Sequence, residues 1–292
     1  MPELPEVQTT VDGLNKKVLK RAFIDVWSDW EKIIKKPKNF NEFKKVIIGK
    51  KIIKVWRRAK NVIIDLSDNY SLLIHQKMTG HLLVGKWKFE NNRWIPEKRG
   101  LLDDPYNRFL HIIFFLDDEK MLALSDSRKF AKVELWKTDE LINSVDFKKL
   151  GLEPLEKNFT FEKFKKVLKN KRGKIKTVLT NPEVIAGIGN IYANESLWRA
   201  KIHPQKNVAN LSEKELKSLY QAIIKVLKKG VDLGGESFSD YRNIEGGKGN
   251  FDDERRVYKR EGQKCRRCGK KIKRIKFNGR SSFFCPTCQF LK

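Results

Sequence analysis

The four cysteines of this chain form two close pairs near its C-terminus, Cys265-x2-Cys268 and Cys285-x2-Cys288, with sixteen residues between the pairs. This spacing is typical of a structural zinc site, because each pair supplies two thiolates and a tetrahedral Zn²⁺ takes four. Four thiolates leave no position for water, so we expect one structural zinc ion. The alternative is two disulfides in a secreted protein, which a reducing compartment disfavours.

The segment between the cysteine pairs predicts a β-hairpin. Residues 270–284 (KKIKRIKFNGRSSFF) alternate in character, and Asn278-Gly279 is a strong signal for a two-residue turn. Arg280 is therefore expected at the tip of a hairpin that zinc holds in place.

Positive charge is concentrated in the same region. The chain has 63 Lys and Arg against 36 Asp and Glu, a formal charge of +27. Between Arg255 and Arg280 stand 13 basic residues and one acidic residue, whereas the other lysines are scattered as on a solvated surface. A compact basic segment is typical of phosphate binding, so we expect a polyanionic partner. Nucleic acid is the commonest, although an anionic membrane surface or ribosomal RNA would also fit.

The apolar patterning predicts neither a membrane span nor a secretory signal. The longest apolar run, residues 109–116, has eight residues including His111, far short of the roughly 18–20 that a span needs. The chain starts MPELPEV, with acidic residues where a signal would be basic and then apolar. We expect a cytoplasmic protein without a membrane partner.

The periodicity changes along the chain from β-type to helical. Residues 5–19 repeat apolar side chains as an amphipathic helix does. From about 21 to 136 short strands, one of them at 46–56, predict a sandwich or barrel, interrupted by an irregular long loop at 86–107. Helical patterns begin near 158, and Ser212-x-x-Glu215 predicts a capping box.

We therefore expect an α+β fold in four parts. They are an N-terminal β-rich domain (1–140), a linker (141–157), a helical domain (158–255) and a four-cysteine zinc finger (256–292).

The N-terminal segment MPELPEV has two interpretations. Proline and glutamate at the start of a helix are common capping residues, and spacing alone favours that explanation. If Met1 is removed, however, Pro2 becomes a secondary amine of moderate basicity, a plausible covalent nucleophile. Glu3 would then stand beside it as an acid or base.

Six stretches, in order along the chain, together resemble one family, the bacterial formamidopyrimidine-DNA glycosylases (8-oxoguanine DNA glycosylase/AP lyase). They run from residue 2 to residue 289 and are MPELPEV (1–7), RRAK (57–60), IHQKMTG (74–80), SDSRKF (125–130), AGIGNIYANESLW (186–198) and NGRSSFFCPTCQ (278–289). The resemblance implies an N-terminal helix with a two-layered antiparallel β-sandwich, then a helix–two-turn–helix domain and a zinc-finger hairpin. It also implies a monomer that acts on damaged double-stranded DNA in the bacterial nucleoid.

The resemblance assigns roles to individual residues. Pro2 attacks C1′ of the damaged nucleotide and forms a Schiff base, with Glu3 as its acid/base partner. Lys60 assists β-elimination, and Arg280 assists the second elimination. The implied DNA-binding residues, some of which fill the gap left by the extruded base or support the pocket, are Glu6, His75, Met78, Arg108, Arg128, Phe130, Lys171, Asn190 and Tyr241.

These residue types suit the reaction, although each alone has a simpler explanation. A base inside duplex DNA must be flipped out before chemistry, and an apolar wedge can take its place. Met78 and Phe130 are suitable wedges, but either residue type is more often part of a core. Arg128 could hydrogen-bond the orphaned partner base.

The sequence departs from the family pattern at several positions. Where a His-Asp-His stretch is usual, this chain has residues 106–109 (YNRF), and Arg108 is expected to replace a DNA-contacting histidine. Gln8, Ala59 and Asn181 replace the more usual glutamate, glycine and acidic residue. The glycine-rich residues 236–250, in the position of the loop that closes over the lesion, are only loosely similar.

Two other functions compete with the purine glycosylase. An endonuclease VIII-type enzyme would prefer oxidised pyrimidines, but PELPEV favours the purine enzyme. A non-catalytic zinc-finger DNA-binding protein is disfavoured by the presence of Pro2, Glu3 and Lys60.

Overall fold

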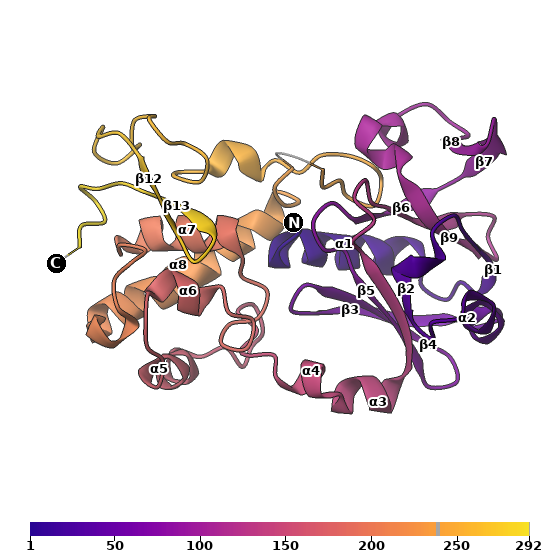
Figure 1. Cartoon of the computed structure of the whole chain (residues 1–292), viewed down its shortest axis with the longest axis horizontal. Coiled ribbons are helices and arrows are strands. Elements are labelled where there is room, and N and C mark those ends of the chain that lie inside the picture. The colour runs from indigo at the N-terminus through magenta and orange to yellow at the C-terminus, as the bar shows by residue number, and fades with distance from the viewer. Residues whose placement is uncertain (238–239, 292) are drawn as a thin grey trace. The chain divides into compact units, whose positions relative to one another are not determined.

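The computed structural model describes residues 1–237 and 240–291 (Figure 1). The chain forms two compact units, one of residues 1–148 and 233–250 and the other of residues 149–232 and 251–292. Residues 233–250, which the sequence patterns placed in the helical part, therefore belong to the first unit, and positions 238–239 of this loop lie outside the described residues. The zinc-finger segment lies in the same unit as the helices.

The first unit is a β-sandwich of two sheets, as the resemblance implied. Neighbouring strands are antiparallel, except that β11 (Lys132–Lys137) runs parallel to β2 (Ile34–Lys36). One sheet has the order β1 (Phe23–Ser28), β9 (Leu110–Leu116), β10 (Met121–Ser125) and β6 (His81–Gly85). The other has the order β2 (Ile34–Lys36), β11 (Lys132–Lys137), β5 (Tyr70–His75), β4 (Asn61–Leu66) and β3 (Ile52–Arg58).

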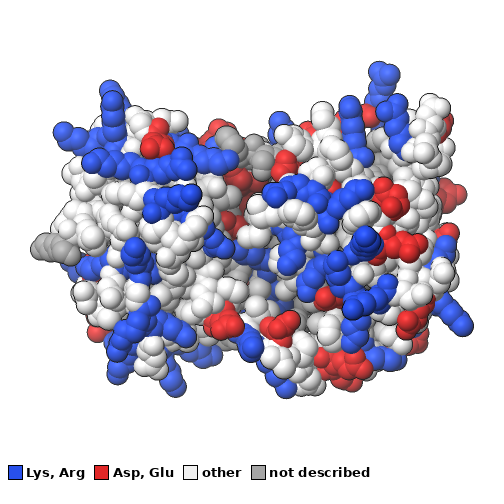
Figure 2. Space-filling model, viewed as in Figure 1, with Lys and Arg blue, Asp and Glu red and all other residues white. Residues whose placement is uncertain are grey.

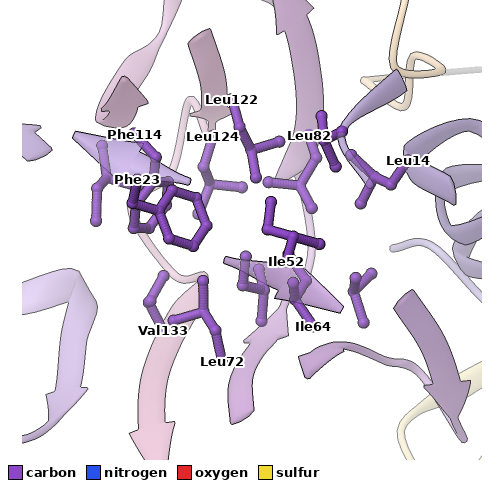
Figure 3. Close-up of a cluster of buried hydrophobic side chains, with 14 of the residues drawn as sticks. Leu14, Phe23, Ile52, Ile64, Leu72, Leu82, Phe114, Leu122, Leu124 and Val133 are labelled. Carbon is purple, nitrogen blue, oxygen red and sulfur yellow. The ribbon is translucent and has the colours of Figure 1, made fainter. Parts of the chain in front are cut away.

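The core of this unit lies between the two sheets and the helix α1 (Leu4–Lys17), which confirms the predicted N-terminal helix. Figure 3 shows Leu14 of α1 pointing toward the same cluster as Phe23 and Phe114. Their side chains are fully buried. Each such side chain contributes roughly 1.5–3 kcal/mol of hydrophobic free energy, which fixes α1 and its N-terminal turn to the sandwich.

The strand predicted at 46–56 is wrong over its first half. Residues 46 and 47 end the helix α2 (Phe40–Ile47), and β3 begins at Ile52. The Asn39 side chain accepts a hydrogen bond from the Glu42 N–H at 3.0 Å and caps the helix. Phe43 and Ile47, four residues apart, are buried on one helix face, and this spacing gives the segment its helical form.

The irregular loop predicted at 86–107 is also wrong in part. It contains a hairpin of β7 (Trp87–Glu90) and β8 (Arg93–Pro96), whose turn residues Asn91 and Asn92 have φ of 50° and 62°. Asparagine tolerates this left-handed conformation, which suits a tight hairpin turn. The ring of Trp94 packs on Trp27, with 5.4 Å between centroids. Two 3-10 turns follow, η2 (Leu101–Asp103) and η3 (Pro105–Arg108).

The second unit packs short helices against a C-terminal hairpin. Its longest helix, α8 (Glu213–Asp232), begins at the predicted capping box, where the Ser212 N–H donates to Glu215 at 2.9 Å. The other elements are α5 (Phe161–Lys169), α6 (Ile175–Leu179), α7 (Asn190–Ala200), η4 (Val208–Asn210), η5 (Phe251–Glu254), β12 (Lys273–Phe277) and β13 (Arg280–Phe284). The first unit also contains η1 (Glu31–Ile33), α3 (Thr138–Asn143) and α4 (Val145–Lys148).

On the face that Figure 2 shows, Lys and Arg cover more of the surface than Asp and Glu do, in agreement with the formal charge of +27. Within the described part of the chain, no helix is both long enough and apolar enough to cross a membrane.

Candidate functional site

The N-terminal turn of α1 buries Pro2, Glu3 and Glu6. Glu3 is the N-cap residue, and its N–H donates to the Glu6 carboxylate at 2.7 Å. Pro5 and Glu6 both lie in the first turn of the helix. The capping interpretation of MPELPEV is therefore correct, and it has a chemical consequence. Glu3 and Glu6 are 2% and 1% exposed, so the turn buries two carboxylates within four residues of Pro2.

Loop 233–250 contacts this turn. The Glu236 N–H donates to the Glu6 carboxylate at 2.8 Å, and the Tyr241 hydroxyl donates to the Glu6 carbonyl oxygen at 3.0 Å. Burial and the charge of Glu6 raise the pKa of Tyr241, so the phenol stays a donor. Gly235 has φ of +85°, and a Cβ there would lie 2.8 Å from the Glu6 side chain. Only glycine allows the loop this close to Glu6.

Lys60 and His75 lie at one end of the larger sheet. Lys60 immediately precedes Asn61 of β4, which pairs with His75 of β5. Burial, followed by the positive charges of Lys77, Lys132 and Lys60, lowers the pKa of His75 to about 3. The Lys77 N–H donates to His75 Nδ1 at 2.9 Å. The ring is therefore neutral with its hydrogen on Nε2, which is the form that can donate to a phosphate oxygen.

Met78 and Phe130 are exposed, with 43% and 52% of their surface accessible. The explanation that these side chains belong to a core is therefore wrong. The Arg128 guanidinium lies 4.5 Å from the Phe130 ring centroid, so the two side chains project together from one loop. Exposed apolar side chains at loop tips are the geometry that a wedge between bases requires.

Asp126 connects the loop of Met78 to the loop of Phe130, and the sequence patterns did not indicate this role. Its carboxylate accepts hydrogen bonds from the Thr79 hydroxyl, from the Ala131 N–H at 2.7 Å and from the Arg128 N–H at 3.3 Å. Thr79 belongs to the loop of Met78, whereas the other two donors belong to the loop of Phe130. An Asp after an apolar strand, bonding to the backbone ahead of it, is the one local signal that could have identified it.

The stretch that replaces His-Asp-His places Arg108 on the surface and Asn107 inside. Arg108 lines a cavity of about 350 Å³ together with Trp87 and Trp94. The buried Asn107 side chain accepts a hydrogen bond from His81 Nε2 at 2.9 Å. Burial lowers the pKa of His81, which keeps this ring neutral.

In the second unit, Arg280 lies at the tip of the predicted hairpin. Asn278 and Gly279 have φ of 48° and 70°, as the two-residue turn requires. Arg280 lines a cavity of about 360 Å³ with Lys176 and Thr177 of α6.

Lys176 of α6 bonds to the hairpin, and the sequence patterns did not indicate this contact. It is buried, and its Nζ donates to the Ser281 carbonyl at 2.7 Å and to the Ser282 hydroxyl at 2.6 Å. Asn190 is the first residue of α7, after the turn in which Gly187 has φ of +85°. Lys171 lies half-buried in the turn after α5.

Glu195 joins α7 to the segment that leads into the zinc finger. Its buried carboxylate accepts N–H bonds from Arg256, Val257 and Tyr258 at 2.8, 3.0 and 2.8 Å. Burial raises the pKa of Glu195, and the three N–H groups oppose that shift. Nothing in the local sequence around Glu195 indicates partners some sixty residues away.

The four cysteines form a site that fits zinc. Their Sγ atoms all lie within 4.8 Å of one another, and none of the four is in a disulfide. The N–H groups of Arg267 and Cys288 donate to the Sγ atoms of Cys265 and Cys285, each at 3.4 Å, which stabilises thiolates. Cys265, Cys268, Cys285 and Cys288 are thus the complete ligand set of one structural Zn²⁺.

The first unit therefore brings together Pro2, Glu3, Glu6 and Tyr241, and it holds Lys60 beside His75. Asn190, Lys171 and Arg280 belong to the second unit. The catalytic and DNA-binding roles of all these residues remain predictions.

Comparison with known proteins identifies the chain. Three family models match it in order: the formamidopyrimidine-DNA glycosylase N-terminal domain over residues 1–133, the H2TH domain of the same glycosylase over residues 150–242, and a zinc finger found in FPG and IleRS over residues 262–289. These matches define a helix–two-turn–helix protein with a C-terminal zinc finger.

Full-length relatives agree. Formamidopyrimidine-DNA glycosylases of Pelotomaculum thermopropionicum and Desulforamulus reducens are 40% and 37% identical, with complete coverage of both chains. The Lactococcus lactis Fpg in complex with abasic-site DNA superposes with a TM-score of 0.86 at 34% identity, covering 99% of this chain and 100% of that one. A MutM complex with DNA containing carbocyclic 8-oxo-G gives 0.85 at 33% identity, with the same coverage. The chain belongs to the formamidopyrimidine-DNA glycosylase family.

Proposed function

We propose that this protein is a bifunctional DNA glycosylase and AP lyase that excises oxidised purines, 8-oxoguanine and formamidopyrimidines, from double-stranded DNA. The buried turn of Pro2 and Glu3, in a chain of this family, is the observation that carries the proposal. The protein acts as a monomer in the cytoplasm, on the nucleoid, without a membrane partner. Solved relatives that contain DNA with an abasic site or with Fapy-dG support this choice of substrate.

The first step uses the amine that removal of Met1 exposes. The lone pair of the Pro2 nitrogen attacks C1′, the bond from C1′ to the base breaks, and the base leaves with the electron pair and a proton. The sugar ring opens to give an iminium ion on Pro2. Glu3, fixed by its cap with Glu6, is the acid and base for these proton transfers.

The second step cleaves the strand. Removal of a C2′ proton next to the iminium expels the 3′ phosphate, and a second elimination expels the 5′ phosphate. Lys60 assists the first elimination and binds phosphate. Arg280, on the zinc-anchored hairpin, binds phosphate with Asn190 and assists the second elimination.

Before chemistry the damaged nucleotide leaves the helix. Met78 and Phe130 fill the gap, and Arg128 hydrogen-bonds the orphaned base. His75, Arg108, Lys171 and Asn190 bind the DNA backbone, while Glu6 and Tyr241 support the pocket. The charge of +27 gives salt-dependent affinity for DNA phosphate. It does not select the damaged base.

Strand cleavage on matched duplexes tests this function. We expect cleavage of an 8-oxoguanine:C duplex with phosphate left at both ends of the gap, the product of two eliminations. A thymine-glycol duplex is the control. Preferential cleavage of thymine glycol would support the endonuclease VIII-type alternative, and binding without cleavage of any damaged duplex would support a non-catalytic protein.

A further inference from the structure

Apart from Arg108, the long segment 86–108 has no role in the proposed reaction, yet its last part contacts loop 233–250. Both belong to the first unit. The Asn107 side chain donates to the Gly246 carbonyl oxygen at 3.2 Å. Gly246 has φ of +88°, and a Cβ there would lie 2.6 Å from the Asn107 amide and from the Leu101 carbonyl. The loop and the two 3-10 turns therefore fit against each other without space for a side chain.

A buried ion pair joins the same two segments. Arg242 is only 2% exposed, and its Nε lies 2.9 Å from the Asp104 carboxylate. Its guanidinium also lies 4.8 Å from the Tyr106 ring centroid and donates to the Tyr241 carbonyl at 2.8 Å. Burial raises the pKa of Asp104, but the hydrogen bond and charge of Arg242 outweigh it and hold that pKa below its ordinary value. Removal of either partner would leave a charge without its counter-ion.

The other side of the loop contacts the N-terminal turn. Tyr241, next to Arg242 in sequence, donates to the Glu6 carbonyl, and the Glu236 N–H donates to the Glu6 carboxylate. That carboxylate accepts the Glu3 N–H. A continuous chain of polar contacts thus runs from Asp104 through Arg242 and Tyr241 to Glu6 and Glu3.

We propose that Asp104 and Arg242 form a latch that positions the N-terminal turn for reaction. The latch holds Gly235, Glu236 and Tyr241 against Glu6. Glu6 in turn holds Glu3 beside the Pro2 amine by accepting the Glu3 N–H. Arg242 and Asp104 are positioning residues: they touch neither substrate nor reacting atoms. This proposal rests on the proposed function, because the turn matters only if Pro2 is the nucleophile. It assigns to segment 100–108 a role in catalysis.

The latch is expected to affect the rate of reaction and not DNA affinity, because none of the predicted phosphate-binding residues belongs to it. In single-turnover reactions with saturating enzyme, we expect Arg242→Met and Asp104→Asn to slow base release from an 8-oxoguanine duplex at least tenfold. The Kd for an uncleavable abasic-analogue duplex should stay within twofold of the unmodified protein. Asp104→Asn keeps the size and an acceptor oxygen, so it tests the charge in a variant that retains the packing.

Lys17→Ala is the matched control. Lys17 forms a 2.9 Å ion pair with Glu245 of the same loop, but both side chains are about half exposed, at 44% and 54%. Exposed pairs contribute little, so this variant should react at the normal rate. Borohydride reduces the covalent intermediate to a stable adduct. The fraction of protein in this adduct at the end of the reaction measures how much of each preparation is folded and competent. Unchanged rates in both latch variants would overturn the proposal. A lower rate would also overturn it if the smaller fraction of competent enzyme in the preparation accounted for the whole decrease. Absence of activity in the unmodified protein would instead refute the proposed function.

Discussion

Removal of the Asp126 carboxylate should destabilise the first unit and loosen the loops of Met78 and Phe130 together. Two buried donors, the Thr79 hydroxyl and the Ala131 N–H, would lose their acceptor, as would the more exposed N–H of Arg128. A buried donor without an acceptor costs about 1–3 kcal/mol, so Asp126→Ala should lower the free energy of unfolding by about 2–6 kcal/mol. Asp126→Asn keeps one acceptor oxygen and should lose about half as much.

Urea unfolding followed by circular dichroism measures this effect, with Ser127→Ala in the same exposed turn as control. The double variant Asp126→Ala/Thr79→Val is the sharper test, because a valine no longer presents a donor that needs the carboxylate. Its loss in free energy of unfolding should be smaller than the summed losses of the two single variants by about 1 kcal/mol or more. Strict additivity, or an Asp126→Ala variant within 0.5 kcal/mol (about one RT) of the unmodified protein, would refute the assignment of Asp126 as the tie between the loops.

Further variants test other parts of the structure. Gln76→Leu should raise the free energy of unfolding by about 1–3 kcal/mol in urea titrations, because the buried Gln76 amide has no hydrogen-bond partner among the described residues; a loss of stability would contradict this. The His75 ring should titrate by NMR near pH 3, whereas the unfolded chain takes up this proton near pH 6.5. The free energy of unfolding should therefore fall by at most about 4–5 kcal/mol as the pH is lowered from 6.5 to 3, and a normal His75 pKa would remove this dependence. Glu195→Ala should cost about 3–9 kcal/mol in the second unit because three N–H donors would lose their acceptor, whereas retention of its thermal transition would show that these bonds contribute nothing. Cys265→Ser should lose zinc and DNA affinity while the β-sandwich stays folded; a zinc-free protein with full affinity would show that the hairpin does not bind DNA.

Features with a local cause were predictable from the sequence. The cysteine spacing, the Asn278-Gly279 turn and the Ser212 capping box each depend on residues a few positions apart, and the structure confirms all three. The helix at 40–47 was missed because its apolar residues merge with the following β-type run, and its start depends on the cap at Asn39.

The long-range ties were not predictable. Asp126 bonds Thr79 across 47 positions, and Glu6 bonds Glu236 across 230. Neither pair has a pattern of spacing that a single sequence displays. Loop 233–250 follows a helix of the second unit, so continuity of the chain favoured its placement there, whereas its contacts with Glu6 place it in the first unit. The exposure of Met78 and Phe130 likewise follows from tertiary structure and not from residue type.

The most direct test of the central claim is the identity of the atom that bonds to DNA. Borohydride reduction during reaction with an 8-oxoguanine:C duplex, followed by peptide mass mapping, locates that atom. The account predicts a chain that begins at Pro2, a covalent adduct on its nitrogen, and loss of the adduct in Pro2→Gly. An adduct on a lysine side chain such as Lys60, or no adduct with a duplex that the protein cleaves, would contradict it.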